Sequence, residues 1–393
     1  MIAVIETHPV QYHAPVYRHA AQQLGLPLHV VYGGDFSVAG YKDKEFGASF
    51  AWDTDLLGGV PHQFLSRVSD GGAGNYDEVK PEGLAAALDA LAPQAVLSLG
   101  YTHPLDRAGL HWAATRRVPV LFRGETSDVA RRRHWMKRLL RDTSLRLLYR
   151  RCAALLYLGH HSREHYRQRG VPESKLFFSP YCIDASTFQA DPVNRVPMRQ
   201  ATRERFGIRE DAVVVLFSGK LSERKGVDLI PHAVRKLPQS MRERVHLLFL
   251  GDGALRDSVR MECEQEPQVA VTFAGFQNQS ALSAFYHAAD LLVLPSRAEE
   301  TWGLVVNEAM LHGLPCIVST TVGSQPDLVL PGETGEICAP GDVDDLARAL
   351  AALMGRLQTP SLADICRARV AKYSVAQAAE GLASAWQAVM KSA

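Results

Sequence analysis

A chain of 393 residues is too long for one ordinary hydrophobic core and fits two domains of roughly 150–200 residues each. Its 43 Lys and Arg residues nearly balance its 42 Asp and Glu residues, and the formal charge of +1 gives no support to binding of nucleic acid by the whole protein. Hydrophobic residues make up 47% of the chain, but no apolar run approaches the ~18–20 residues of a membrane-spanning helix. Composition therefore favours an ordinary globular protein.

The first residues and the cysteines favour the cytoplasm. The chain begins with MIAVIE, which resembles a strand rather than the basic and apolar leader of a signal peptide. The six cysteines include no C-x-x-C pair, which argues against a disulfide framework or a zinc site. We therefore expect a cytoplasmic protein with buried, reduced cysteines.

Short apolar, β-branched runs alternate with helical stretches along the chain. The expected strands are residues 2–6, 28–33, 95–100, 118–124, 153–159, 212–219, 246–253, 269–275, 290–295 and 315–320. Continuous apolar strands that alternate with amphipathic helices predict parallel sheets covered by helices on both faces. The pattern restarts at Ala212 after a turn-rich segment, residues 184–211. The sequence therefore predicts an α/β protein of two doubly wound domains.

The loop after the first strand carries unusual polar residues. In ETHPVQYHAPVYRHAA, residues 6–21, Pro15 suits the first turn of a helix. The side chains before it would lie at the carboxyl edge of the first sheet, where such folds bind ligands. They are either candidate binding residues or parts of a capped turn, and they are His8, Gln11, Tyr12 and His13.

A second loop is rich in glycine and lysine. In FSGKLSERKGVDLI, residues 217–230, a strand ends at Gly219, Lys220 follows at once, and Lys225 precedes the next helix. Glycines let the backbone approach a phosphate, and lysines and a helix N-terminus supply positive charge. The sequence predicts an anion cradle here, and the alternative is a pair of solvated surface lysines.

The turn GDGALR, which begins at Gly251, follows another strand but lacks the third glycine of a dinucleotide fingerprint. A nicotinamide oxidoreductase would also alternate strands and helices, but it needs that G-x-G-x-x-G motif, and the chain has none.

Two carboxylates flank an apolar run in EETWGLVVNEAMLHG, residues 299–313. We expect a helix to begin near 301–303, with Glu300 just before it and Glu308 about two turns in. Eight residues correspond to about 80° of helical rotation, so both acids could face one ligand. A carboxylate at Glu308 suits the two hydroxyls of a ribose. The alternative is that the acids only complement the helix dipole and the solvent.

The segments SGKLSERKG, GDGALR, FAGF and PSRAEETWGLVVNEAMLHGLPCIVSTTVGSQPDLVLPGETGEI together resemble the family 4 retaining glycosyltransferases. Their clearest signature is E-x₇-E, here Glu300 to Glu308. The resemblance covers about 212–349 and implies the GT-B fold, in which two Rossmann-like domains face a central cleft. It implies an acceptor-side domain of residues 1–185, onto which the C-terminal helix 374–393 crosses back, and a donor-binding domain of residues 186–373.

The resemblance assigns roles on the donor side. Lys220, which stands where the family usually has Arg, and Lys225 would hold the diphosphate of a nucleotide sugar. Glu300 would contact the donor sugar and Glu308 the ribose. The other implied donor-binding positions are Gly219, Gly251, Phe276, Trp302, Gly303, Leu304 and Val305.

The first half departs from the family pattern. HPVQYHAP replaces the Gly-Gly loop that many members carry after the first strand, and Arg123 stands where many have a histidine. Arg123 and Glu125, which lies two residues beyond it, are candidates for the acceptor side. His103 is a further candidate for the cleft, and we include it among the catalytic candidates with Glu300 and the two lysines.

The implied reaction transfers a sugar from a nucleoside diphosphate to a hydroxyl of a glycan, lipid-linked or small-molecule acceptor, with retention. In such front-face mechanisms the leaving phosphate oxygen accepts the proton of the acceptor. We favour UDP over GDP, and we expect no cofactor and no metal, because no Asp-x-Asp motif stands at a suitable loop. The alternatives are a nucleotide-sugar epimerase of GT-B architecture and a non-catalytic sugar-nucleotide-binding protein.

The segment RRRHWMKRLLRDTSLRLLYRR, residues 131–151, is strongly basic and amphipathic. Such a helix can lie on an anionic bilayer, which would suit a lipid-linked acceptor and a peripheral location at the inner face of the membrane. The alternative is a domain helix with a solvated outer face.

Overall fold

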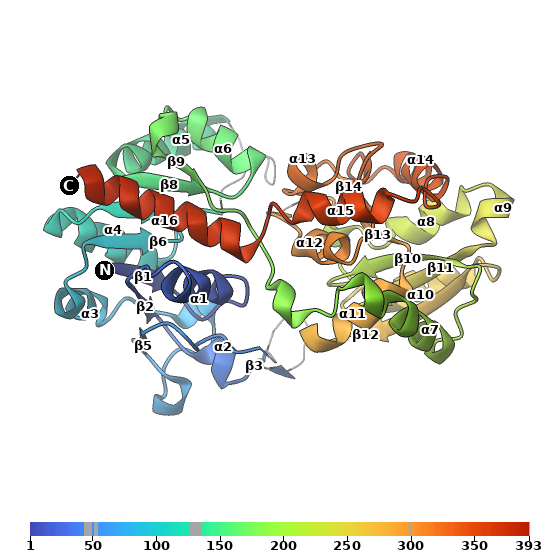
Figure 1. Cartoon of the computed structure of the whole chain (residues 1–393), viewed down its shortest axis with the longest axis horizontal. Coiled ribbons are helices and arrows are strands. Elements are labelled where there is room, and N and C mark those ends of the chain that lie inside the picture. Colours follow the sequence, from blue (N-terminus) through green and yellow to red (C-terminus); the bar gives the residue numbers. More distant parts are fainter. Residues whose placement is uncertain (43–48, 51–53, 126–134, 299, 393) are drawn as a thin grey trace. The chain divides into compact units, whose positions relative to one another are not determined.

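A computed structural model describes residues 1–42, 49–50, 54–125, 135–298 and 300–392. The described chain divides into two compact units. The first unit contains the residues up to Cys182 together with those from Ser374 onward, and the second runs from Ile183 to Tyr373 (Figure 1).

The first unit is built on a seven-stranded parallel sheet in the order β5-β2-β1-β6-β7-β8-β9. Its strands are β1 Ile2–Glu6, β2 Leu28–Tyr32, β5 His62–Phe64, β6 Ala95–Ser98, β7 Val120–Phe122, β8 Ala154–Tyr157 and β9 Leu176–Phe178. A separate antiparallel pair consists of β3 Tyr41–Lys42 and β4 Ser49–Phe50.

Helices cover both faces of this sheet. They are α1 Ala14–Gln22, α2 Phe36–Ala39, α3 Leu84–Leu91, α4 Pro104–Arg116, α5 Trp135–Arg151, α6 His160–Arg167 and α16 Val375–Ser392. The side chains of β1 alternate between two cores, as a strand between two helical layers requires. Ile2 and Val4 join the core formed with α1 and α16, whereas Ala3 and Ile5 join the core formed with α3, α4, α5 and α6.

The C-terminal helix α16 packs within the first unit, against α1, β8 and β9 (Figure 1). Close contact is achieved through Gly381, where a Cβ atom would lie 1.8 Å from the carbonyl oxygen of Phe178. Ser179 Oγ also donates a hydrogen bond to the carbonyl of Ala378 at 2.8 Å. The helix is therefore attached to this sheet by backbone proximity as well as by apolar packing.

The second unit has a six-stranded parallel sheet in the order β12-β11-β10-β13-β14-β15. Its strands are β10 Val213–Ser218, β11 Val245–Leu250, β12 Ala270–Gly275, β13 Leu291–Leu294, β14 Cys316–Ser319 and β15 Gly335–Cys338. Its helices are α7 Arg195–Arg205, α8 Leu229–Arg235, α9 Gln239–Arg242, α10 Arg256–Glu264, α11 Gln279–Ala288, α12 Leu304–Leu311, α13 Gln325–Leu328, α14 Val343–Met354 and α15 Leu362–Val370.

The prediction of parallel sheets is confirmed, and every strand expected from the sequence is present. The short strands β5, β9 and β15 escaped prediction because three or four residues at a sheet edge carry too little periodicity. All six cysteines are buried free thiols. Within the described residues, no helix is long and apolar enough to cross a membrane.

Candidate functional site

The loops that follow β10 and β13 meet at the carboxyl edge of the second sheet, because these two strands are neighbours. Lys225 Nζ donates to Glu300 Oε2, and Ser296 Oγ donates to the same oxygen at 3.1 Å. The guanidinium of Arg224 lies 3.8 Å away. Glu300 is only 8% exposed, so this ion pair is held largely out of water. The structure thus brings together two of the predicted donor-side residues.

Glycines let the loops of this edge approach one another closely. A Cβ atom at Gly251 would lie 2.0 Å from the carbonyl oxygen of Gly219, and Gly251 has a φ of +119°. A Cβ atom at Gly226 would lie 2.3 Å from the carbonyl oxygen of Pro295. The predicted glycine turn therefore shapes the edge through the backbone. Lys220 follows Gly219 directly and is partly exposed.

Helix α12 begins at Leu304, with Gly303 as its N-cap at a φ of 86°. The predicted start near 301–303 is correct to about one residue. Glu300 precedes the helix, as expected, and its backbone forms a parallel bridge with Val322. The estimate of about 80° of helical rotation does not apply to the two acids, because only Glu308 lies on the helix.

Glu308 has its own partner, which sequence reasoning missed. Tyr286 of α11, itself fully buried, donates its hydroxyl to Glu308 Oε2 at 2.5 Å. Its ring stacks on His312, with 4.9 Å between ring centroids, and His312 Nδ1 donates to the carbonyl of Glu308 at 2.7 Å. Burial raises the pKa of Glu308 to about 7, and the bond from Tyr286 opposes that rise. Glu308 can therefore change its charge near neutral pH.

The residues between the two acids divide into packing and exposed positions. Val306 is fully buried, whereas Leu304 and Val305 keep exposed surface. Trp302 is buried, and its indole donates to Asn307 Oδ1 at 2.8 Å, which fixes the start of the helix. The side chain of Trp302 is thus used in packing and in holding Asn307. Phe276, which follows β12, is an exposed aromatic side chain.

In the first unit, a series of buried polar residues runs from Glu6 through His13 to Arg123, and each residue is at most 6% exposed. His13 Nδ1 lies 2.6 Å from Glu6 Oε1, and His13 Nε2 lies 3.0 Å from Arg123 Nη1. Because a guanidinium can only donate, Nε2 accepts and Nδ1 carries the proton given to Glu6. Burial and the neighbouring Arg123 lower the pKa of His13 to about 3. His13 is therefore a neutral link between an acid and a cation.

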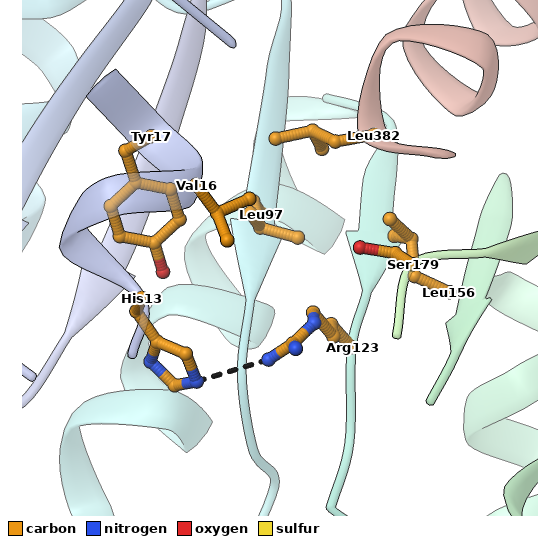
Figure 2. Close-up of a pocket in the computed structure, with 8 residues that line it drawn as sticks. All are labelled: His13, Val16, Tyr17, Leu97, Arg123, Leu156, Ser179 and Leu382. Atoms are coloured by element: carbon orange, nitrogen blue, oxygen red, sulfur yellow. Dashed lines mark hydrogen bonds between the residues drawn. The ribbon is translucent and has the colours of Figure 1, made fainter. Parts of the chain in front are cut away.

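Figure 2 shows that the His13–Arg123 pair lines a small apolar-walled cavity, with Tyr17, Leu97 and Leu382 around it. Its volume is about 10 Å³, which is room for about one water molecule and far too little for a sugar. Arg123 also lies over the ring of Tyr181, 5.2 Å from the centroid, and Glu125 is 3.9 Å from His13 Nε2. The sequence prediction did not include Glu6. A carboxylate at the end of an apolar strand is the feature that could have revealed it.

The other acceptor-side candidates lie around the same edge. His8 Nδ1 is 2.9 Å from Thr7 Oγ1, and burial lowers its pKa to about 4. Tyr12 packs edge-on against the rings of His13 and Tyr181. Gln11 places its amide oxygen out of water, and no donor within the described part of the chain reaches it.

His103 has a structural task. Its Nδ1 accepts from the backbone N–H of Leu105 at 3.1 Å and so caps α4, and its Nε2 lies 3.3 Å from the carbonyl of Tyr76. Both ring nitrogens are thus engaged, with the proton on Nε2. A catalytic role for His103 stays a prediction.

The basic segment falls partly outside the described residues, which resume at Trp135. On α5, Leu145 and Tyr149 are buried, whereas Leu140 is 72% and Leu147 55% exposed. The helix therefore contributes to the core and also exposes leucines among arginines. Membrane association stays a prediction.

Within the described residues, no group of three or more His, Cys, Asp or Glu side chains could hold a metal ion.

Comparison with known proteins gives a family for the second unit. Residues 198–360 match the family model described as "Glycosyl transferases group 1". The chain is 29% identical over 199 residues to lipopolysaccharide 1,2-N-acetylglucosaminetransferase of Salmonella typhimurium, covering 47% of this chain and 50% of that protein. It is 29% identical over 275 residues to a GDP-mannose-dependent alpha-(1-6)-phosphatidylinositol monomannoside mannosyltransferase of Mycolicibacterium smegmatis. This match covers 67% of this chain and 65% of that protein. The chain thus spans less than two thirds of the length of these curated relatives.

Solved structures match nearly the whole chain. Anabaena Alr3699/HepE in complex with UDP aligns with a TM-score of 0.72 and 18% identity, over 98% of this chain and 99% of that one. The apo form of the lipopolysaccharide outer core galactosyltransferase WaaB aligns with a TM-score of 0.68 and 14% identity, with the same coverage. At these identities the likeness shows the fold, which is GT-B, as the sequence predicts.

Proposed function

Since residues 198–360 match the family model of the group 1 glycosyltransferases, we propose that this chain transfers a sugar from a nucleoside-diphosphate sugar to an acceptor hydroxyl, with retention of configuration. The observation that carries this proposal is the pair of acids at one sheet edge. Glu300 is buried against Lys225, and Glu308 is held separately by Tyr286. A site for a diphosphate sugar needs both a cation for the phosphates and carboxylates for the hydroxyls of sugar and ribose.

The phosphates would be held by positive charge at this edge. Lys220 and Lys225 follow the end of β10, and the N-terminus of α12 adds its N–H dipoles. These groups stabilise the charge that develops on the departing diphosphate. The leaving phosphate oxygen would itself take the proton of the acceptor, so the protein mainly positions the reactants.

The two acids would bind hydroxyl groups. Glu300 uses Oε2 for Lys225 and Ser296, which leaves Oε1 for a hydroxyl of the donor sugar. Glu308 uses Oε2 for Tyr286, which leaves Oε1 for the ribose. The exposed Phe276 and the partly exposed Leu304 and Val305 supply apolar surface for the base. In the first unit, Arg123 and its neighbours are the proposed acceptor side.

We propose UDP rather than GDP as the nucleotide. The support is the matched fold of Alr3699/HepE, whose structures include complexes with UDP and with UDP-glucose. A GDP-mannose-dependent relative is the competing observation. The named acceptors of the relatives, a lipopolysaccharide and a phosphatidylinositol mannoside, favour a glycan or lipid-linked acceptor.

The test is nucleotide release from a panel of UDP-sugars and GDP-sugars, with and without simple glycan acceptors. We expect UDP release that an acceptor accelerates, and a product with the anomeric configuration of the donor by NMR. The substitution Lys225→Met should abolish the release of UDP. Glu333→Ala, which removes an exposed acid from the same unit, should not. Conversion of a nucleotide sugar into an isomer without nucleotide release would instead indicate an epimerase.

A further inference from the structure

The second unit contains another pocket, at the opposite edge of its sheet. The residues that immediately precede β10, β13 and β14, namely Ala212, Asp290 and Pro315, line a pocket of about 440 Å³. Glu300 and Glu308 follow the carboxyl end of β13, whereas this pocket lies where the strands begin. Its volume falls within the roughly 300–1,000 Å³ typical of small-molecule sites. The pocket is therefore separate from the proposed nucleotide site.

Arg195 and Arg199 of α7 line this pocket, whereas Arg203 of the same helix does not. Arg199 Nη2 donates to Asp290 Oδ1 at 2.8 Å, and Arg203 Nη2 donates to Asp290 Oδ2 at 2.8 Å. The backbone N–H of Val214 donates to the same Oδ2 at 2.8 Å. Asp290 is thus occupied by two guanidinium groups and an amide, so it has little capacity left for a third cation.

Arg195 lies one turn before Arg199 and lines the same pocket. It is half-buried, and its Nη2 donates to the carbonyl of Ala289 at 3.3 Å. In the described part of the chain, no carboxylate oxygen lies within 4.0 Å of its guanidinium. Burial, and after it the charge of Arg199, lowers the pKa of Arg195. Asp290 favours the charged form of Arg195 without direct contact, and an anion bound in the pocket would stabilise this cation further.

Two acids that line the pocket, Glu210 and Asp211, do not form an ion pair with Arg195. Glu210 and Asp211 are both exposed, and Asp211 lies 3.6 Å from the guanidinium of Arg209. Exposed charges are screened by water and salt, whereas a half-buried guanidinium is screened much less. The two exposed acids therefore leave the half-buried guanidinium of Arg195 able to attract an added anion.

A second part of the lining is mixed in character. It is formed by the segment that enters β14 and by the residues around the start of α15, and it carries the polar side chains of Gln358 and Thr359 beside the apolar side chains of Leu314, Pro315, Leu357, Pro360 and Leu362. Such a wall accepts a flat or aliphatic group, and a guanidinium fork accepts two oxygens of a phosphate or carboxylate.

We propose that this pocket binds a small organic oxyanion, a phosphate or carboxylate group on an apolar body, with Arg195 as its principal partner. The proposal is independent of the sugar transfer described above, because it uses other residues at another edge of the sheet.

The test is calorimetric titration of phenyl phosphate into the full chain saturated with UDP, which occupies the proposed nucleotide site. We expect binding to wild type, weaker binding of inorganic phosphate, and none of phenol. Benzoate, compared with phenyl phosphate, distinguishes carboxylate from phosphate preference. Arg195→Gln should weaken phenyl phosphate binding by at least about tenfold, which corresponds to ~1.4 kcal/mol.

Arg205→Gln is the matched control, because Arg205 lies on the same helix, is exposed, and stacks on Phe206 outside the pocket. It should bind as wild type does. Ala363→Phe, which fills the pocket from the other wall, should abolish binding and covers the case in which Arg195→Gln folds poorly. The proposal would be overturned by equal binding to wild type and both pocket variants or by no binding at all. Binding that is seen without UDP but lost in its presence would also overturn it.

Discussion

Replacing Tyr286 by Phe removes the hydroxyl that donates to Glu308 at 2.5 Å and leaves the ring stacked on His312. A hydrogen bond to a charged group contributes about 1.5–3 kcal/mol. The hydrogen bond from Tyr286 favours the ionised form of Glu308. Burial already raises the pKa of this carboxyl group to about 7. Loss of the hydrogen bond should raise the pKa of Glu308 to about 8–9, at 1.36 kcal/mol for each pH unit.

The consequence for UDP binding follows from the fraction of ionised Glu308. At pH 7 about half of the wild-type carboxylate is ionised, whereas about one tenth or less is ionised in Tyr286→Phe. If the ribose hydroxyls bind the ionised form, the apparent affinity at pH 7 should fall by about fivefold to fiftyfold. At pH 9 the two proteins should bind UDP within about twofold of each other.

The assay is calorimetric titration of UDP at pH 6, 7, 8 and 9 with wild type and Tyr286→Phe. The ionisation of UDP is the same in both series. The ratio of the two dissociation constants therefore reports only the difference between the two proteins. Wild-type affinity should itself rise with pH through about 7. A ratio that stays constant with pH would refute the reasoning, because Tyr286 would then act by packing alone.

Three further predictions concern stability. Lys225→Met leaves the buried Glu300 without its closest cation and should lower the free energy of unfolding by about 3–5 kcal/mol in urea denaturation, with partial recovery on adding Glu300→Gln. The pKa of Glu308 is about 7 against an ordinary 4.5, so its stabilising effect is full below pH 4.5 and is lost as pH rises through 7. Wild-type stability relative to Glu308→Gln should therefore fall between pH 5 and pH 8. Gly381→Ala should lower the Tm, because its Cβ would lie 1.8 Å from the Phe178 carbonyl oxygen, although alanine favours helices by about 1 kcal/mol.

Each of these predictions has a clear contrary result. A Lys225→Met variant as stable as wild type would mean that Glu300 is not dependent on this ion pair. A stability difference that does not change with pH would mean that Glu308 keeps an ordinary pKa in the folded protein. A Gly381→Ala variant that melts at or above the wild-type temperature would mean that α16 does not approach β9 so closely.

The architecture was predictable because the long strands are continuous apolar runs between helical stretches. Residues 213–218 and 245–250 are buried throughout, as strands between two helical layers must be. The short strand His62–Phe64 is half-buried and mixed in character, so nothing in its sequence distinguishes it from a loop. The start of α12 was predictable from the apolar run that follows Gly303.

The site was predictable only where chemistry is local. Lys225 and Glu300 stand out as charged residues in the loops that follow apolar strands, but their contact depends on β10 and β13 being neighbours, which no local pattern reveals. Tyr286 was missed because its bond to Glu308 depends on how two helices pack. Glu6 was read as part of a strand, and only the fold shows it bonded to His13.

The most direct test of the nucleotide-sugar proposal is a thermal-shift panel of UDP, GDP, ADP and NAD on wild type, Glu308→Ala and the exposed control Glu333→Ala. A ligand at about 100 times its dissociation constant adds about 2.7 kcal/mol to the stability of the folded state, which is a readily measured shift. We predict that UDP stabilises wild type and Glu333→Ala, and that Glu308→Ala responds much less. Stabilisation by NAD alone, or by none of the four nucleotides, would contradict the assignment of this sheet edge to a nucleoside diphosphate.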